Sequence, residues 1–105
     1  MMVKKLDKQG FDEALKTGGK PMAVDFATDW CPYCKQLAPI FDEIAREHGE
    51  KIDFYYVDTD EQEEVGDRYD VMTVPTVIVF QNGEVVRSAV NPRSKEAVLD
   101  LLFPS

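Results

Sequence analysis

Residues 29–39 read DWCPYCKQLAP and contain both cysteines of the chain, Cys31 and Cys34, three residues apart. From Cys34 to Ala45 the apolar residues recur with helical spacing, so the pair lies at the start of a predicted helix. A domain of 105 residues can fold without cross-links, and a disulfide across so short a spacing removes little entropy from the unfolded chain. We therefore expect the two thiols to carry chemistry rather than to stabilise the fold.

The amino end of the predicted helix favours an anionic sulfur at Cys31. Unpaired backbone N–H groups and the helix dipole point at this position, so the pKa of Cys31 is expected to lie below that of a free cysteine. Pro32 suits the first helical position, where its missing N–H would be unpaired anyway. Cys34 follows one turn later on the same face, at a spacing that a disulfide permits. We expect Cys31 to attack a disulfide of a partner and Cys34 to release the reduced partner.

Asp25 is a charged residue inside the nearly continuous apolar stretch MAVDFAT, residues 22–28, which is typical of a strand buried on both faces. Burial disfavours the ionised carboxylate, so the pKa of Asp25 should rise, and the group could then act as general base towards Cys34. A half-exposed strand residue is the alternative. Trp30 also has two possible interpretations. It is either a flat apolar platform beside the sulfur or an ordinary partly buried aromatic.

Strands and helices alternate along the rest of the chain, and Asn82-Gly83 predicts a hairpin near its end. This order predicts one α/β domain over residues 1–105, with a central mixed sheet of about five strands flanked by about four helices. Strands are expected at residues 3–6, 22–28, 52–57, 76–80 and 84–90. Helices are expected from Asp7 to Gly18-Gly19, from Cys31 to Gly49 with a kink at Pro39, over residues 61–69, and after Ser94.

Composition excludes several classes of function. The formal net charge of −8 and the absence of a basic patch argue against nucleic acid and against anionic membrane surfaces as partners. The apolar run at residues 77–80 is too short to span a bilayer, and MMVKKLDKQG is not followed by the apolar run of a secretory signal. With Met1-Met2 resembling an initiator, we expect a cytoplasmic monomer. Two cysteines and His48 are too few for a closed zinc site, so no metal is expected, although a cluster shared between two chains stays open.

Three segments resemble the thioredoxin family, in the order in which that family has them. They are VDFATDWCPYCKQLAPIFDEIA at residues 24–45, Tyr69 with TVPT at residues 73–76, and VIVFQNGEVV with the closing helix. The resemblance implies the thioredoxin fold, with Cys31 as nucleophile, Cys34 as resolving thiol and Asp25 as the buried acid. From the residues alone Pro75 is a proline at the start of a strand.

The resemblance adds further implied roles. Pro75 matches a cis-proline that faces the disulfide, and Val74 offers backbone hydrogen bonds to an extended substrate, beside Trp30, Pro32 and Tyr33. It implies no cofactor other than a redox-active Cys31–Cys34 disulfide. The implied partners are protein disulfides and a thioredoxin reductase or similar electron donor.

The sequence departs from the family pattern in four places. Pro32-Tyr33 replaces the usual Gly-Pro and makes the glutaredoxin signature Cys-Pro-Tyr-Cys, which predicts a weaker reductant than an ordinary thioredoxin. Ala27 replaces an aromatic residue, Tyr56 stands where a lysine usually neighbours the buried acid, and Asn91-Pro92 replaces a glycine beside the substrate groove.

Three hypotheses follow from the sequence. The first is a thiol–disulfide oxidoreductase that reduces protein disulfides. The second is a glutathione-linked glutaredoxin, although the glycine-rich segment that glutaredoxins use for glutathione is missing after TVP. The third is a binding module without enzymatic activity, in which a metal cluster could be held between two chains.

Overall fold

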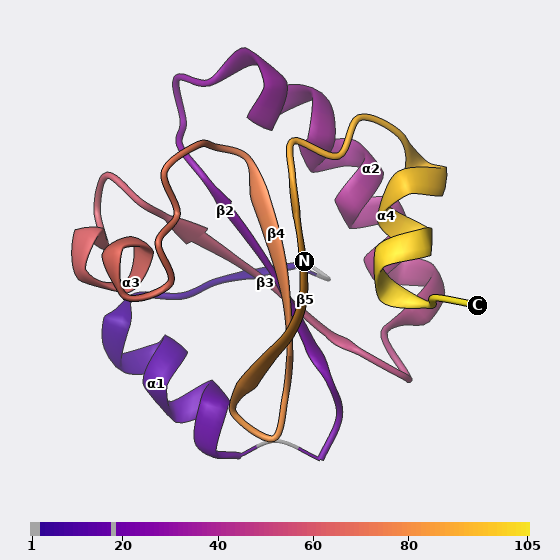
Figure 1. Cartoon of the computed structure of the whole chain (residues 1–105), viewed down its shortest axis with the longest axis horizontal. Coiled ribbons are helices and arrows are strands. Elements are labelled where there is room, and N and C mark those ends of the chain that lie inside the picture. Colours follow the sequence, from indigo (N-terminus) through magenta and orange to yellow (C-terminus); the bar gives the residue numbers. More distant parts are fainter. Residues whose placement is uncertain (1–2, 18) are drawn as a thin grey trace.

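The computed structural model describes residues 3–17 and 19–105. Within this part of the chain, five strands form one mixed sheet in the order β1-β3-β2-β4-β5 (Figure 1). Strands β1, β3 and β2 run parallel, and β4 and β5 add to the sheet in antiparallel fashion. The elements are β1 (Lys4–Lys5), α1 (Lys8–Lys16), β2 (Met22–Ala27), α2 (Pro32–His48), β3 (Asp53–Asp58), α3 (Glu63–Arg68), β4 (Thr76–Gln81), β5 (Glu84–Val90) and α4 (Lys95–Leu102).

The helices lie in two layers, one on each face of the sheet (Figure 1). Side chains alternate along a strand, so Ala23 of β2 packs with α2 and α4, whereas Val24 packs with α1. All six residues of β2 are buried because both of its faces are covered. The predicted α/β architecture and its mixed sheet are thus confirmed, and β2 is central with β3 and β4 on either side.

Capping side chains set the helix starts that the sequence predicts. Asp7 accepts a hydrogen bond from the Gly10 N–H at 2.7 Å, and Ser94 accepts one from the Ala97 N–H at 3.0 Å. Gly49 is the C-cap of α2, also as predicted. Between β4 and β5, Asn82 and Gly83 both have positive φ, as a tight hairpin requires.

Several boundaries differ from the prediction. The first strand shrinks to two residues, and α3 starts at Glu63 rather than at residue 61. Helix α1 ends with Thr17 as its C-cap, and the predicted end at Gly18-Gly19 falls partly outside the described residues, since Gly18 is not among them. Helix α2 continues through Pro39, and the kink expected there stays a prediction.

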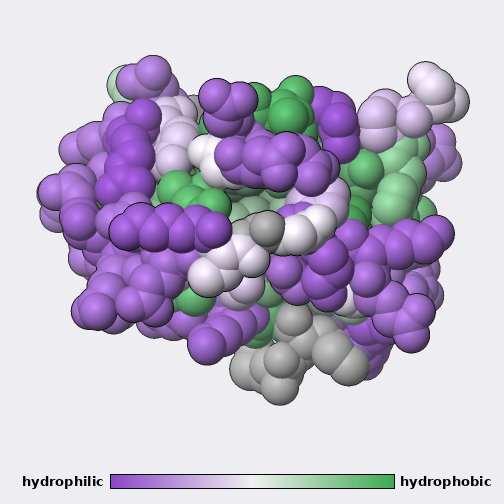
Figure 2. All heavy atoms as spheres, turned by 90° about the horizontal axis from the view of Figure 1, so that it is seen from below, coloured by the Kyte–Doolittle hydropathy of each residue, from purple (hydrophilic) through white to green (hydrophobic). Residues whose placement is uncertain are grey.

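The face of the molecule seen in Figure 2 is largely polar, in keeping with the net charge. Hydrophilic side chains dominate there and small apolar areas lie between them. Within the described part of the chain, no helix combines the length and the apolar character that a membrane span needs.

The side of the sheet that packs against α1 should be highly sensitive to truncation at Phe11. Its ring is fully buried and lies edge-on to Phe26, Tyr69 and Phe80, with centroids 5.7–6.3 Å apart. We expect Phe11→Ala to lower the free energy of unfolding by about 3–5 kcal/mol, because the change removes buried contacts and leaves a cavity. Urea denaturation measures this loss. Phe103→Ala, at a ring that is 39% exposed, is the control and should cost less; equal losses would contradict the packing described.

Candidate active site

The two cysteines lie where β2 gives way to α2. Cys31 is the N-cap residue of α2, and Pro32 takes the first helical position. The Cys31 Sγ accepts a hydrogen bond from the Cys34 backbone N–H at 3.2 Å. Both thiols are free and each residue is only 4% exposed. The helix start therefore offers a backbone donor to the Cys31 sulfur and places the Cys34 sulfur one helical turn later.

A second loop meets the thiol pair from the start of β4. The Val74–Pro75 peptide bond is cis, as the resemblance implied, and the Cys31 thiol donates to the Val74 carbonyl oxygen at 3.8 Å. Asn91 adopts a positive φ of 51°, a backbone conformation that asparagine tolerates better than most residues. Its N–H donates to the Pro75 carbonyl oxygen at 2.7 Å. This hydrogen bond ties the loop at Asn91 to the loop before β4.

Two exposed aromatic side chains flank the cysteines. Trp30 is 67% exposed, which contradicts the interpretation as a partly buried aromatic, and its role as a flat apolar platform beside the sulfur stays a prediction. Its indole N–H donates to Asp60 Oδ2 at 2.7 Å. Tyr33 is 44% exposed, and the guanidinium carbon of Arg93 lies 4.6 Å from the centroid of its ring. Sequence reasoning missed Asp60 and Arg93, because nothing local marks partners that come from distant loops.

Asp25 lies beneath the active-site helix, on the sheet face that α2 covers. In the sheet register it pairs with Tyr56 of β3 and Val77 of β4. The residue is 4% exposed, and its Oδ1 atom has no hydrogen-bond partner. Burial in these surroundings raises the pKa of Asp25 to about 7. The interpretation as a buried acid is therefore correct, and the half-exposed alternative is wrong.

Cys34 is also electrostatically disfavoured as an anion. Burial raises the pKa of its thiol, and the neighbouring Cys31 sulfur and the Asp25 carboxyl raise it further, whereas a backbone hydrogen bond from Thr28 opposes the shift. The thiol of Cys34 therefore retains its proton until a base removes it. Asp25, whose own pKa lies near neutrality, stays the predicted base for this proton.

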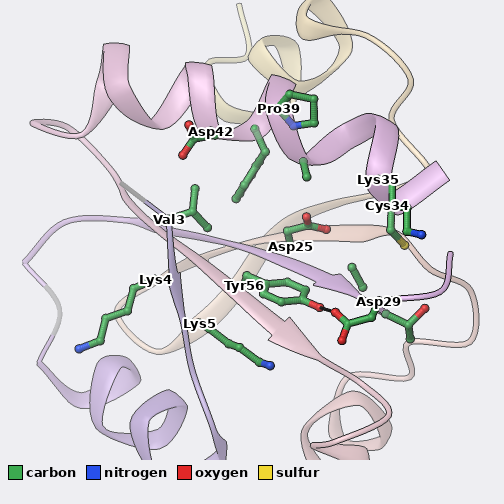
Figure 3. A pocket seen from close by; sticks show the side chains of 14 residues that line it. Val3, Lys4, Lys5, Asp25, Asp29, Cys34, Lys35, Pro39, Asp42 and Tyr56 are labelled. Carbon is green, nitrogen blue, oxygen red and sulfur yellow. Dashed lines mark hydrogen bonds between the residues drawn. The ribbon is translucent and has the colours of Figure 1, made fainter. Parts of the chain in front are cut away.

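A large pocket lies between α2 and the sheet, with a volume of about 1060 Å³. Asp25, Cys34 and Tyr56 line it, and the Tyr56 hydroxyl donates to Asp29 Oδ1 at 3.3 Å (Figure 3). Burial, together with the nearby carboxylates, raises the pKa of Tyr56, so its hydroxyl stays protonated and donates. The sequence analysis did not predict this pocket, although the small side chain of Ala27, which lines the pocket, could have indicated space at this position.

Comparisons with known proteins agree over the length of the chain. A family model described as Thioredoxin matches residues 2–103. The chain is 35% identical over 102 residues to the thioredoxin of Bacillus subtilis (strain 168). These aligned residues cover 97% of this chain and 96% of that protein. This chain belongs to the thioredoxin family. The thioredoxins of Staphylococcus haemolyticus (strain JCSC1435) and Staphylococcus aureus (strain N315) are 36% and 34% identical to it, with the same coverage.

Membership in the thioredoxin family decides between the functional hypotheses. The chain is a thiol–disulfide oxidoreductase of the thioredoxin fold, with its two cysteines spaced as in a CxxC motif. The glutaredoxin alternative is not favoured, in spite of the Cys-Pro-Tyr-Cys signature, because the related proteins are named thioredoxins. Within residues 3–17 and 19–105, no three His, Cys, Asp or Glu side chains are grouped to hold a metal ion, and His48 instead lies against Phe103 with ring centroids 4.8 Å apart.

Replacing Asp25 of this thioredoxin-family protein should change how stability depends on pH. The pKa of Asp25 rises from 3.8 to about 7 on folding, so the folded state holds its proton more tightly than the unfolded chain. The contribution of this group to stability is therefore complete below pH ~4 and is lost as the pH rises through about 7. Relative to Asp25→Asn, the unmodified protein should lose about 3–4 kcal/mol of unfolding free energy between pH 4 and pH 8.

Urea unfolding of the reduced proteins at several pH values measures this difference. Asp67→Asn is the matched control, because Asp67 is an exposed carboxylate of α3 and its replacement should leave the pH profile as it was. Parallel stability curves for Asp25→Asn and the unmodified protein would show that the Asp25 carboxyl is solvated.

Proposed function

We propose that this chain, as a single domain over residues 1–105, reduces disulfide bonds of other proteins, with Cys31 as attacking thiol and Cys34 as resolving thiol. The observation that carries the proposal is the position of the Cys31 sulfur. It accepts the Cys34 N–H at the start of α2 and lies within reach of the Val74 carbonyl, next to the cis-proline. A backbone N–H donor there favours a thiolate, which is the form that attacks disulfides.

The proposed cycle has two exchange steps. In the first, the Cys31 thiolate forms a bond to one sulfur of the substrate disulfide, and the other substrate sulfur leaves with the electron pair of the broken bond and takes up a proton. In the second, Cys34 gives its proton to Asp25 and attacks the Cys31 sulfur. The second substrate sulfur leaves as a thiolate, and the products are a reduced substrate and a Cys31–Cys34 disulfide.

The surface around Cys31 supports binding of an extended substrate segment. The backbone of Val74 next to cis-Pro75 is suited to pair with such a segment, as strand-like recognition requires. Trp30 and Tyr33 supply exposed aromatic area beside the sulfur, and the Asp60 hydrogen bond holds the indole of Trp30 in one orientation. Pro32 contributes an exposed ring between the two cysteines. We assign these five residues to substrate binding.

The remaining assignments follow from family membership and charge. The redox-active pair serves as the only redox group, and electrons come from a thioredoxin reductase or a similar donor. We expect a cytoplasmic monomer that acts on protein disulfides and not on nucleic acids or membranes, consistent with the net charge of −8.

Serine variants of the two cysteines test the assignment of roles. In insulin reduction with dithiothreitol as the electron source, Cys31→Ser should lose all turnover. Cys34→Ser should lose turnover but accumulate mixed disulfides with insulin, since the second exchange step is blocked. Non-reducing gel electrophoresis and mass spectrometry detect these adducts. Retained turnover in Cys31→Ser, or adducts on residue 34 instead, would reverse the roles.

The electron donor tests the second hypothesis. We expect a flavin thioredoxin reductase with NADPH to restore the dithiol during insulin reduction, and glutathione alone to restore it slowly. NADPH oxidation and insulin precipitation give the two rates. Faster recycling by glutathione than by the reductase would favour the glutaredoxin-like function, and a visible absorbance band from iron in a purified dimer would favour the binding module.

A further inference from the structure

The loop between β5 and α4 passes beside the first turns of α2 (Figure 1). Tyr33 of α2 and Arg93 of this loop line a small hollow between the two segments. The guanidinium carbon of Arg93 lies 4.6 Å from the centroid of the Tyr33 ring, within the range of a cation–π contact. Because Tyr33 stands between the two cysteines in the sequence, a positive charge is held at one edge of the disulfide-exchange site.

The backbone that carries Arg93 is fixed on both sides. Before it, the Asn91 N–H donates to the Pro75 carbonyl oxygen at 2.7 Å, and Pro92 is buried. After it, Ser94 is the N-cap of α4, and its side chain accepts a hydrogen bond from a backbone N–H of that helix at 3.0 Å. Little backbone freedom is therefore left to be lost when a ligand binds at Arg93, which favours binding.

The charge of Arg93 is not neutralised by an ion pair. In the part of the chain that the structure describes, ion pairs include Arg68 and several lysines but not the exposed Arg93. Arg87 differs again, because it donates to the Leu101 carbonyl oxygen at 2.7 Å. Contact with the Tyr33 ring uses the flat face of the guanidinium. Its N–H groups lie in the plane of the group, and these are the donors that bind a carboxylate.

The other edge of the site carries carboxylates. Asp60 follows β3 and Arg93 follows β5, and these strands lie on opposite sides of β2 in the sheet. Asp60 accepts the hydrogen bond of the Trp30 indole, and Asp29 directly precedes Trp30 in the sequence. The nearby Lys35 is not part of the Arg93 edge, because it lines the pocket beneath α2 together with Asp29. A substrate carboxylate is therefore repelled at the Trp30 edge and attracted at the Arg93 edge.

We propose that Arg93 is a specificity-determining residue, which binds an aspartate or glutamate side chain next to the attacked disulfide of the substrate. The inference rests on the proposed function above and names the class of protein disulfide that the site prefers. Side chains alternate along an extended segment, so residues two positions before and after the substrate cysteine lie on the same face as its sulfur. A carboxylate at one of these two positions meets the Arg93 edge, and at the other it meets the Trp30 edge.

Peptides with a 2-thiopyridyl disulfide on their single cysteine are the probes that test this preference. The Cys31 thiolate bonds to the peptide sulfur, and the thiopyridine leaves with the electron pair of the broken bond and takes up a proton. The absorbance of the pyridine-2-thione that forms gives the rate. Two peptides carry Glu two positions before or two positions after the cysteine, and their partners carry Gln there. The reference protein is the full-length Cys34→Ser chain, in which only this first exchange occurs.

Arg93→Gln in this reference chain should lower the Glu-to-Gln rate ratio about two- to fivefold at one of the two peptide positions, as the loss of an exposed ion pair predicts. Arg46→Gln is the matched control and should keep the ratio, because Arg46 is exposed near the far end of α2 and its loss changes the net charge equally. Tyr33→Leu removes the ring that holds the guanidinium and should also lower the ratio, whereas Tyr33→Phe should keep it.

Two results would overturn the specificity of Arg93: an unchanged ratio in Arg93→Gln at both peptide positions, or an equal fall in Arg46→Gln. Cys31→Ser separates this inference from the proposed function. Pyridine-2-thione release that persists in Cys31→Ser contradicts the proposed function, whereas release that requires Cys31 but does not depend on Arg93 contradicts only the specificity.

Discussion

The hydrogen bond from the Cys34 N–H to the Cys31 sulfur ties the start of α2 to the chemistry of the pair. A helix start leaves backbone N–H groups without partners. In α1 and α4 the side-chain oxygens of Asp7 and Ser94 accept one of these hydrogen bonds, and in α2 the Cys31 sulfur accepts it. The same bond therefore helps to define the helix and supplies a donor to the proposed nucleophile. It also sets the second sulfur one helical turn away, close enough for the exchange to finish within one molecule.

The position of this helix start depends on the central strand beneath it. Strand β2 ends at Ala27, and after the buried Thr28 the chain reaches the surface at Asp29 and Trp30. The loop before β4 meets it there, with the Asn91 N–H holding the Pro75 carbonyl. Three segments far apart in the sequence thus meet beside the Cys31 sulfur, and the sheet order β2-β4-β5 brings them together.

Burial of Asp25 illustrates how stability is traded for reactivity. An ionised carboxylate at this position is unfavourable, and none of the described residues pairs a cation with it, since Tyr56 occupies the neighbouring position of β3. In the proposed cycle, a pKa near neutrality makes this group a better proton acceptor for Cys34 than a solvated aspartate. The space left around it, with Ala27 in place of a larger side chain, is also what opens the pocket beneath α2.

The sequence by itself determined the family, the order of the elements, the caps at Asp7, Cys31 and Ser94, and the chemistry of the thiol pair. These features are local, since they depend on periodicity, turn residues and spacing within a few positions. Only the tertiary structure decided that Asp60 holds Trp30, that Arg93 covers Tyr33, and that Asp25 Oδ1 and Thr28 Oγ1 are buried without partners. Such contacts join loops and strands distant in sequence, and their geometry follows from how the sheet and helices pack rather than from any local pattern.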